Sequence, residues 1–256
     1  MRMASNNRWA WRAGSVGVTL ALVGLWGLVT QLGLVSRVFL PGPLATVQAL
    51  WQNLLGGELA VQALETLRRM LLGWLLASVL GICLGAVIGS FAQARKWLLP
   101  TLELLRPLPA SALLPVGIAL FGLTPGMLLA TVAFGAVWPV LLATVHGFSA
   151  IDSRLREVAQ VLGFSRSSFV FKFGFPNALP DILSGMRVSL TASLIVTVVG
   201  ELLTAQTGLG STIMLAARTY RSTDLYAGVL VLGVIGFANN ALLGLAERKL
   251  LRWQQA

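Results

Sequence analysis

Six stretches of apolar residues, each long enough to cross a lipid bilayer as a helix, recur along this sequence. A helix needs about 20 apolar residues to cross the roughly 30 Å hydrocarbon core of a bilayer. Because 56% of the residues are hydrophobic and only 11% are charged, the chain carries more apolar surface than a soluble core of its length requires. We therefore expect an all-α polytopic membrane protein with about six transmembrane helices, which cover roughly residues 14–34, 67–91, 98–121, 125–146, 186–203 and 225–245.

The third stretch, residues 98–121, differs from the others because Pro107, Pro109 and Pro115 interrupt it. A proline removes a backbone hydrogen bond from a helix, which is tolerated at membrane depth where neighbouring helices or a water-lined cavity satisfy the freed carbonyls. The sequence therefore predicts a kinked or broken span that is packed inside the bundle.

The second stretch contains small residues at intervals of four, which form one stripe along a helix: Gly73, Ala77, Gly81, Gly85 and Gly89. Such a stripe lets two helix backbones approach each other closely. Packing within the chain is the favoured interpretation, and packing against another subunit is the alternative.

The basic residues between the spans indicate how the chain is oriented. If both termini lie on one side of the membrane, fourteen of the nineteen Lys and Arg residues fall on that side, including Arg106 and those of residues 147–185. Cytoplasmic loops carry an excess of Lys and Arg, so we expect both termini and the loop 147–185 in the cytoplasm.

The short, dispersed basic segments argue against nucleic-acid binding. Without a linker or a second domain, residues 1–256 are expected to form a single transmembrane domain.

The sequence lacks the motifs that bind nucleotides or metals. A phosphate-binding loop needs glycines followed by Lys and Ser or Thr, and the nearest candidate, residues 208–212, has no Lys. His146 and Cys83 are the only residues of their kinds, which excludes a His/Cys metal cluster and argues against a Cys–His catalytic pair. We therefore expect no enzymatic activity and no cofactor on this chain.

Glu201 stands out among the few acidic residues because it ends the fifth span, beside Gly200. An ionisable residue near membrane depth is a functional candidate by default; the alternative is a carboxylate that reaches water at the outer interface. No chain of carboxylates crosses the bilayer, which argues against an ion-coupled secondary carrier. That carrier and a membrane scaffold without a transport role are the alternative functions.

The polar, basic segment of residues 154–187 is predicted to form two short helices around a turn. Apolar residues recur at helical spacing over its first nine positions. Gly163 is expected to end the first helix and Ser165 to cap the second. Pro176 and Pro180 are expected to break the helical pattern before the fifth span begins.

This segment contains the pattern E-V-A-x-x-x-G, nine further residues, and then F-x-F-P. It resembles the EAA loop of bacterial ABC-importer permeases, which is E-A-A-x-x-x-G, nine residues, then I-x-L-P. Glu157, Ala159, Gly163 and Pro176 fall on the pattern, and the substituted positions keep apolar residues. Similarity to the taurine, aliphatic sulfonate and nitrate branch extends over nearly the whole chain, including the segments LPGP, LRPLPASALLP and TGLG that begin at residues 40, 105 and 207.

The resemblance implies a type I ABC-importer permease fold, in which the EAA segment forms a coupling helix that rests on a cytoplasmic ATPase. Glu157, Ala159, Gly163 and Pro176 would be the coupling residues: Glu157 would meet a basic residue of the ATPase, Ala159 would allow close helix approach, and Gly163 would allow the sharp turn. The resemblance also implies a permease homodimer in the bacterial inner membrane, two ATPase subunits that bind ATP and Mg, and a periplasmic or lipid-anchored solute-binding protein.

The same branch favours a small organic sulfonate such as taurine, nitrate or a similar small anion as the substrate. The residues expected on the outer side, as part of the pathway or of a docking surface for the binding protein, are Glu201, Gly208, Gly210, Arg218 and Arg221. The two arginines could attract an anion, and interfacial anchoring is the alternative.

Overall fold

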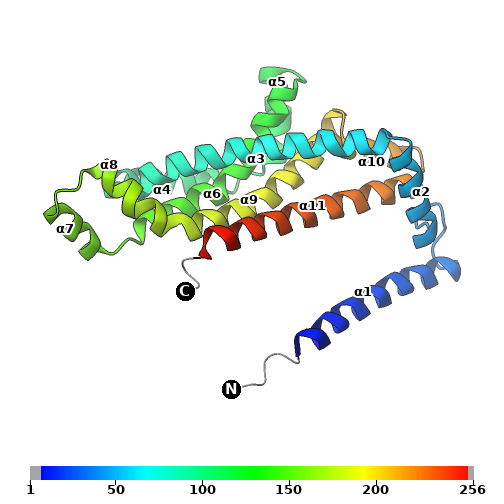
Figure 1. Ribbon diagram of the computed structural model, residues 1–256. Helices are drawn as coiled ribbons and strands as arrows, with labels where there is room; N and C mark the ends of the chain where they lie inside the picture. The colour runs from blue at the N-terminus through cyan, green and yellow to red at the C-terminus, as the bar shows by residue number, and fades with distance from the viewer. Residues whose placement is uncertain (1–6, 253–256) are drawn as a thin grey trace. The chain divides into compact units, whose positions relative to one another are not determined.

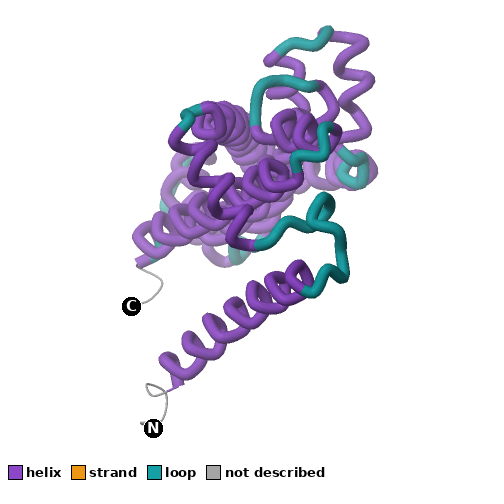
Figure 2. Tube along the Cα trace, turned by 90° about the vertical axis from the view of Figure 1, so that its right-hand side faces the viewer, coloured by secondary structure: helices purple, strands orange, loops and turns teal. Residues whose placement is uncertain are grey.

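The computed structural model describes residues 7–252, without the side chains of residues 7–13, 153, 156 and 166. Every regular element in this part of the chain is helical (Figures 1 and 2). Five helices are long and apolar enough to span a membrane: Asn7–Gln31 (α1), Glu58–Ser90 (α3), Pro125–Ser149 (α6), Phe175–Thr204 (α9) and Ser222–Leu250 (α11). The predicted all-α membrane architecture is confirmed.

The third predicted span is broken into two parts. Ala92–Leu105 (α4) is separated by a short break from the 3₁₀ turn Ala110–Leu113 (η1) and the helix Leu114–Phe121 (α5), and the two parts are bent by 79°. Pro107 and Pro109 lie in the break, where their missing N–H groups cannot continue the hydrogen bonds of α4. The predicted break is confirmed.

The expectation that this span is packed inside the bundle is met only in part by α4: none of its residues is buried, although Leu99 and Leu102 pack against a buried cluster of α3 and α6 residues. Hydropathy does not distinguish a side chain that faces lipid from one that faces another helix. α5 does pack against α6, through Leu114 in a buried cluster with Met127 and Leu128. Arg106, which the charge count placed with the cytoplasmic loops, follows α4 and lies about 20 Å along the helix axis from its start.

The chain divides into two compact units. The smaller comprises the described residues up to 61 together with residues 212–231, and the larger comprises residues 62–211 and those from 232 onward. In the smaller unit, Trp26 Nε1 donates to the carbonyl of Pro41 (2.9 Å), and the Trp26 ring stacks on Tyr226 with centroids 6.1 Å apart. These contacts join α1 to the first turns of α11, beside the short helix Pro43–Leu55 (α2).

The stripe of small residues on α3 packs against α6 of the same chain in the larger unit. A Cβ atom added at Gly85 would lie 2.6 Å from Thr144 Cβ, and one at Gly89 would lie 2.6 Å from Phe148 Cβ. Real Cβ atoms do not approach so closely, so only glycine permits this spacing between the two helix backbones. The favoured interpretation, packing within the chain, is confirmed.

α6 and α9 form the other tight contact of the larger unit (Figure 1). A Cβ at Gly185 would lie 2.7 Å from the carbonyl oxygen of Pro139, and one at Gly147 would lie 2.8 Å from Ala178 Cα. Ser189 Oγ on α9 donates to the carbonyl of Ala136 on α6 (2.6 Å). Together with α3, these helices form the scaffold from which the loop after α6 projects.

Candidate coupling loop and buried carboxylate

The first helix of the loop, Ser153–Val161 (α7), has a defined start and a defined end. At its start, the backbone N–H of Arg154 donates to Asp152 Oδ1 (2.9 Å), which satisfies one of the free amides of the first turn. At its end, Gly163 has φ +72°, its N–H donates to the carbonyl of Gln160, and that of Phe164 donates to Ala159, each at 3.0 Å. This pair of bonds is the Schellman motif, and it confirms that Gly163 ends the helix.

The second helix begins as the sequence predicts but does not end where it predicts. Ser165 Oγ accepts from the backbone N–H of Ser168 (3.2 Å) and caps Arg166–Phe169 (α8). A wide π turn, Val170–Gly174 (η2), then leads directly into α9. The prediction that Pro176 and Pro180 break the helical pattern is wrong. Pro176 lies in the first turn of α9, where its fixed φ suits a helix and its missing N–H has little effect, and Pro180 is accommodated inside the helix.

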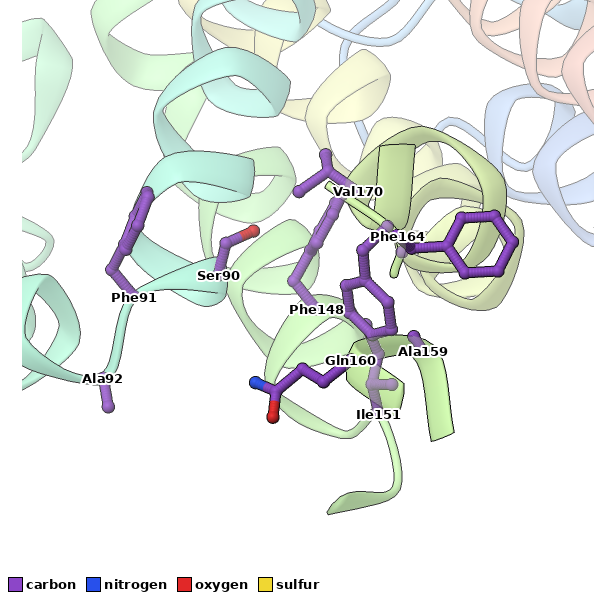
Figure 3. Close-up of a pocket in the computed structure, with 11 residues that line it drawn as sticks. Ser90, Phe91, Ala92, Phe148, Ile151, Ala159, Gln160, Phe164 and Val170 are labelled. Atoms are coloured by element: carbon purple, nitrogen blue, oxygen red, sulfur yellow. The ribbon is translucent and has the colours of Figure 1, made fainter. Parts of the chain in front are cut away.

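One side of α7 faces the chain itself. Ala159 is only 4% exposed and lines a cavity of about 290 Å³ together with Ile151 and Phe164 (Figure 3). The opposite wall of this cavity comes from Ser90 and Phe91, where α3 ends. The close approach that the small side chain of Ala159 permits is therefore an approach within this chain.

The other side of α7 is uncovered. Glu157 is exposed, and so are four apolar side chains at helical spacing: Leu155, Val158, Val161 and Leu162. Val161 is 87% exposed. No described side chain forms an ion pair with Glu157. The helix thus presents an apolar stripe and a carboxylate that has no ion-pair partner among the described side chains.

Glu201, near the end of α9, lies in the opposite kind of environment. It is fully buried (0% exposed) and forms an ion pair with Arg69 of α3. Its carboxylate also accepts from Thr66 Oγ1 (2.9 Å) and from the backbone N–H of Gly210 (3.0 Å). The alternative in which this carboxylate reaches water is wrong. A buried charge is stable only when it is paired and hydrogen-bonded, and Glu201 has both kinds of partner.

The TGLG segment folds over this carboxylate. The N–H of Leu209, where Leu209–Arg218 (α10) begins, donates to Thr66 Oγ1 (2.8 Å), and Arg69 donates to the carbonyl of Thr207 (3.2 Å). Gly208 and Gly210 are buried, and a Cβ at Gly210 would lie 2.7 Å from Glu201 Cβ. Glycine is required because the loop backbone lies directly against the acidic side chain.

Arg218 and Arg221 belong to the smaller unit, and the other three predicted outer residues belong to the larger unit. Both arginines are exposed. Arg221 pairs with Asp224 (2.6 Å), and the side-chain amide of Asn53 donates to the same carboxylate (2.8 Å). Arg218 has no ion-pair partner among the residues that the structure describes.

Sequence reasoning missed the partners of Glu201. Sequence analysis gave no role to Arg69 or to Thr66. A signal was present: the two residues are three positions apart, so they share one face of a helix, and a buried acid needs such a partner. Among residues 7–252 no group of three or more His, Cys, Asp or Glu side chains could hold a metal ion.

Solved structures share this fold. The chain matches an inward-facing MetNI methionine ABC transporter with a TM-score of 0.66 and 19% identity, over 77% of this chain and 96% of that one. It matches an amino acid ABC transporter crystallised with histidines with a TM-score of 0.61 and 18% identity, over 78% and 97% of the two chains. At such identities the likeness concerns the fold.

Relatives at higher identity cover nearly the whole sequence. The chain is 33% identical to a Bacillus subtilis protein named as an aliphatic sulfonates transport permease, SsuC, over 97% of this chain and 90% of the relative. It is 30% identical to the taurine transport system permease protein TauC of Escherichia coli, over 96% and 93%. It is 28% identical to the nitrate import permease protein NrtB of Leptolyngbya laminosa, over 76% and 70%.

The family model described as "Binding-protein-dependent transport system inner membrane component" matches residues 77–252. This range includes the helices α6 and α9, the loop between them and Glu201, but not its partners Thr66 and Arg69. It is a family of membrane subunits, not of enzymes, and the ion-coupled carrier is not favoured. The chain belongs to the family of binding-protein-dependent transport system inner membrane components, as the permease of an ABC transporter.

Proposed function

We propose that this permease imports a small anion, an organic sulfonate such as taurine or else nitrate, and that α7 is the helix through which a cytoplasmic ATPase drives it. The claim that the ATPase acts through α7 rests on the uncovered face of this helix. Its apolar stripe and Glu157 have no described partner in the chain, and an amphipathic helix of this kind fits a groove on another protein.

The loop geometry supports a mechanical role for α7. The Schellman turn at Gly163 fixes the direction of the chain after the helix. From Ser165 onward, helical structure continues through η2 into α9 without a flexible linker. A force applied to α7 would therefore be transmitted to α9, and through its glycine contacts to α6. Coupling by this route needs Glu157 on the ATPase side and Ala159 on the permease side. The exposure of Glu157 and the burial of Ala159 support this arrangement.

The orientation follows from the charge distribution, with the loop 147–185 and both termini in the cytoplasm of a bacterial cell and the chain in the inner membrane. We place two copies of the permease with two ATPase subunits, which bind ATP and Mg, and one external solute-binding protein. Arg218 and Arg221, both exposed, are then on the outer side, where they are available to the binding protein. The start of α10 is held in place by three buried residues, Glu201, Gly208 and Gly210.

The substrate class rests on the names of the relatives, which are permeases for aliphatic sulfonates, taurine and nitrate. These substrates are all small oxoanions. In this proposal the external binding protein determines most of the substrate selectivity, and the permease accepts the anion that the binding protein delivers.

The proposal is tested in proteoliposomes that hold the permease with its ATPase, supplied with binding protein and radiolabelled taurine. We expect ATP-dependent uptake that Glu157→Ala abolishes while the protein still inserts and folds. Glu103, also exposed but on α4, provides the control: Glu103→Ala should transport normally. Uptake that persists in Glu157→Ala, or that follows an ion gradient without ATP, would contradict the proposal.

A further inference from the structure

A second cavity, of about 340 Å³, lies where the end of α4 meets the middle of α6 and of α9. Its wall includes Arg106, Trp138, Pro139, Ala143, Ser184 and Gly185. The volume falls at the lower end of the range for small-molecule sites, so the cavity suits a ligand of a few heavy atoms.

Three side chains of this wall can donate hydrogen bonds: Arg106, Trp138 and Ser184. Trp138 is only 8% exposed, and its Nε1 is buried without a hydrogen-bond partner among the described residues. An indole N–H can only donate, and a buried donor of this kind normally has an acceptor. Arg106 has no ion pair with a described side chain, and Ser184 adds a hydroxyl. No carboxylate lines the cavity. The missing partner is therefore an acceptor, and the guanidinium favours an anionic one.

The cavity lies near the middle of the membrane. Trp138 is eleven residues from the end of α6 at Ser149, or about 16 Å along the helix, which is half of a hydrocarbon core of about 30 Å. Arg106 lies at the break between α4 and η1. Ionisable residues at such depth mark ligand pathways, and in many transporters broken helices form the binding site near the midplane.

We infer that this cavity is a binding site for a small oxoanion on the transport pathway, with Arg106 supplying the charge and Trp138 and Ser184 supplying hydrogen bonds to its oxygens. The inference rests on the proposed function in that it names where the transported anion binds within the permease. Pro139 and the neighbouring apolar wall accommodate the alkyl part of a sulfonate.

The test uses the full-length permease with its ATPase in proteoliposomes, in a Cys83→Ala background with Ser184→Cys as the only thiol. Two methanethiosulfonate reagents are compared, one carrying a sulfonate and one a trimethylammonium group, with rates corrected for their reactivity toward a free thiol. We expect the anionic reagent to react about tenfold faster, because a cationic cleft concentrates anions. Arg106→Gln should remove this preference, and Arg106→Lys should keep it. Lys96→Gln, on the same helix but outside this cavity, should leave it unchanged.

Ligand protection gives a second readout. Methanesulfonate should slow the labelling of Ser184→Cys, and dimethyl sulfone, which is neutral and of similar size, should not. Trp138→Phe keeps the ring and removes the N–H donor, so it should raise the methanesulfonate concentration needed for half protection by about tenfold, the effect of one lost hydrogen bond to a charged group. Absence of labelling, equal rates for the two reagents, or a preference that survives Arg106→Gln would overturn the site.

Labelling requires neither ATP nor uptake, so the two proposals can fail separately. A charge preference in an importer that takes up no anion would support the site and contradict the proposed substrate. Sulfonate uptake by an importer whose cavity shows no charge preference would overturn the site alone.

Discussion

Glu157 and Glu201 are both acidic residues of glycine-containing segments, yet their environments in the structure are opposite. Glu201 is buried and has an ion pair, a hydroxyl donor and a backbone donor from its own chain. Glu157 is exposed on α7 and pairs with none of the described side chains. The comparison separates two roles that sequence alone does not distinguish: a carboxylate that holds the permease together and a carboxylate that is left for a partner.

The glycines of the two segments differ in the same way. Gly210 is fixed by contact with the Glu201 side chain, whereas an added Cβ at Gly163 meets nothing within 4 Å and the residue is needed only for its positive φ. Substitutions near Glu201 should therefore reduce the stability of the permease itself. Substitutions on α7 should impair coupling to the ATPase without unfolding the permease.

The largest expected effect is that of Glu201→Ala, which leaves the largely buried charge of Arg69 without an ion-pair partner. Breaking a buried ion pair from one side costs about 3–5 kcal/mol, and we expect a large fall in folded yield and in the unfolding temperature in detergent. Glu201→Gln keeps an acceptor for Thr66 and should lose less. A variant Glu201→Ala as stable as the parent would show that the buried cluster has no structural role.

Glu157→Ala should have no effect on the unfolding temperature and a large effect on binding of the ATPase. Removing one partner of a charge pair that becomes buried at an interface costs on the order of 2–5 kcal/mol of binding free energy. The measurements are the unfolding temperature of the permease and its affinity for the purified ATPase. Loss of stability with unchanged affinity would reverse the roles assigned to the two acids.

Gly210→Ala sharpens the comparison inside the buried cluster. The added methyl group would meet Glu201 Cβ at 2.7 Å, and overpacking of this kind costs about 1–3 kcal/mol. Gly233 on α11 provides the control, because an added Cβ there meets nothing within 4 Å. Gly233→Ala should leave the unfolding temperature unchanged or raise it, and equal losses in the two variants would contradict the packing argument.

Gly163→Ala should have the smallest effect of the series. The positive φ of this residue costs a residue with a Cβ about 1–2 kcal/mol, and the loss should be confined to α7 because no other element contacts the position. Hydrogen exchange of the α7 amides should rise, while exchange in α6 and α9 stays unchanged. Gly163→Asn, which tolerates this conformation better, should show a smaller rise.

Helix ends and caps, which depend on nearby residues, were predicted correctly from the sequence. Contacts between residues that are far apart in the chain were missed. Gly163 and Ser165 act within a few positions of themselves, so the end of α7 and the cap of α8 were correct. The Arg69–Glu201 pair joins residues 132 positions apart, and no local pattern contains it. The helix break predicted at Pro176 and Pro180 was wrong, because proline disfavours a helix only where its N–H and the preceding turn matter. The incomplete burial of α4 was missed because hydropathy does not show how deeply an apolar side chain is buried.

The most direct test of the central claim is a cross-link from the uncovered face of α7 to the ATPase. A photo-reactive residue in place of Val161, the most exposed apolar position on that helix, should cross-link to the ATPase in membranes of cells that produce both subunits. The same residue at Leu120 on α5 should not. Cross-linking at Leu120 but not at Val161, or labelling of Val161→Cys by a membrane-impermeant reagent added outside the cell, would contradict the account.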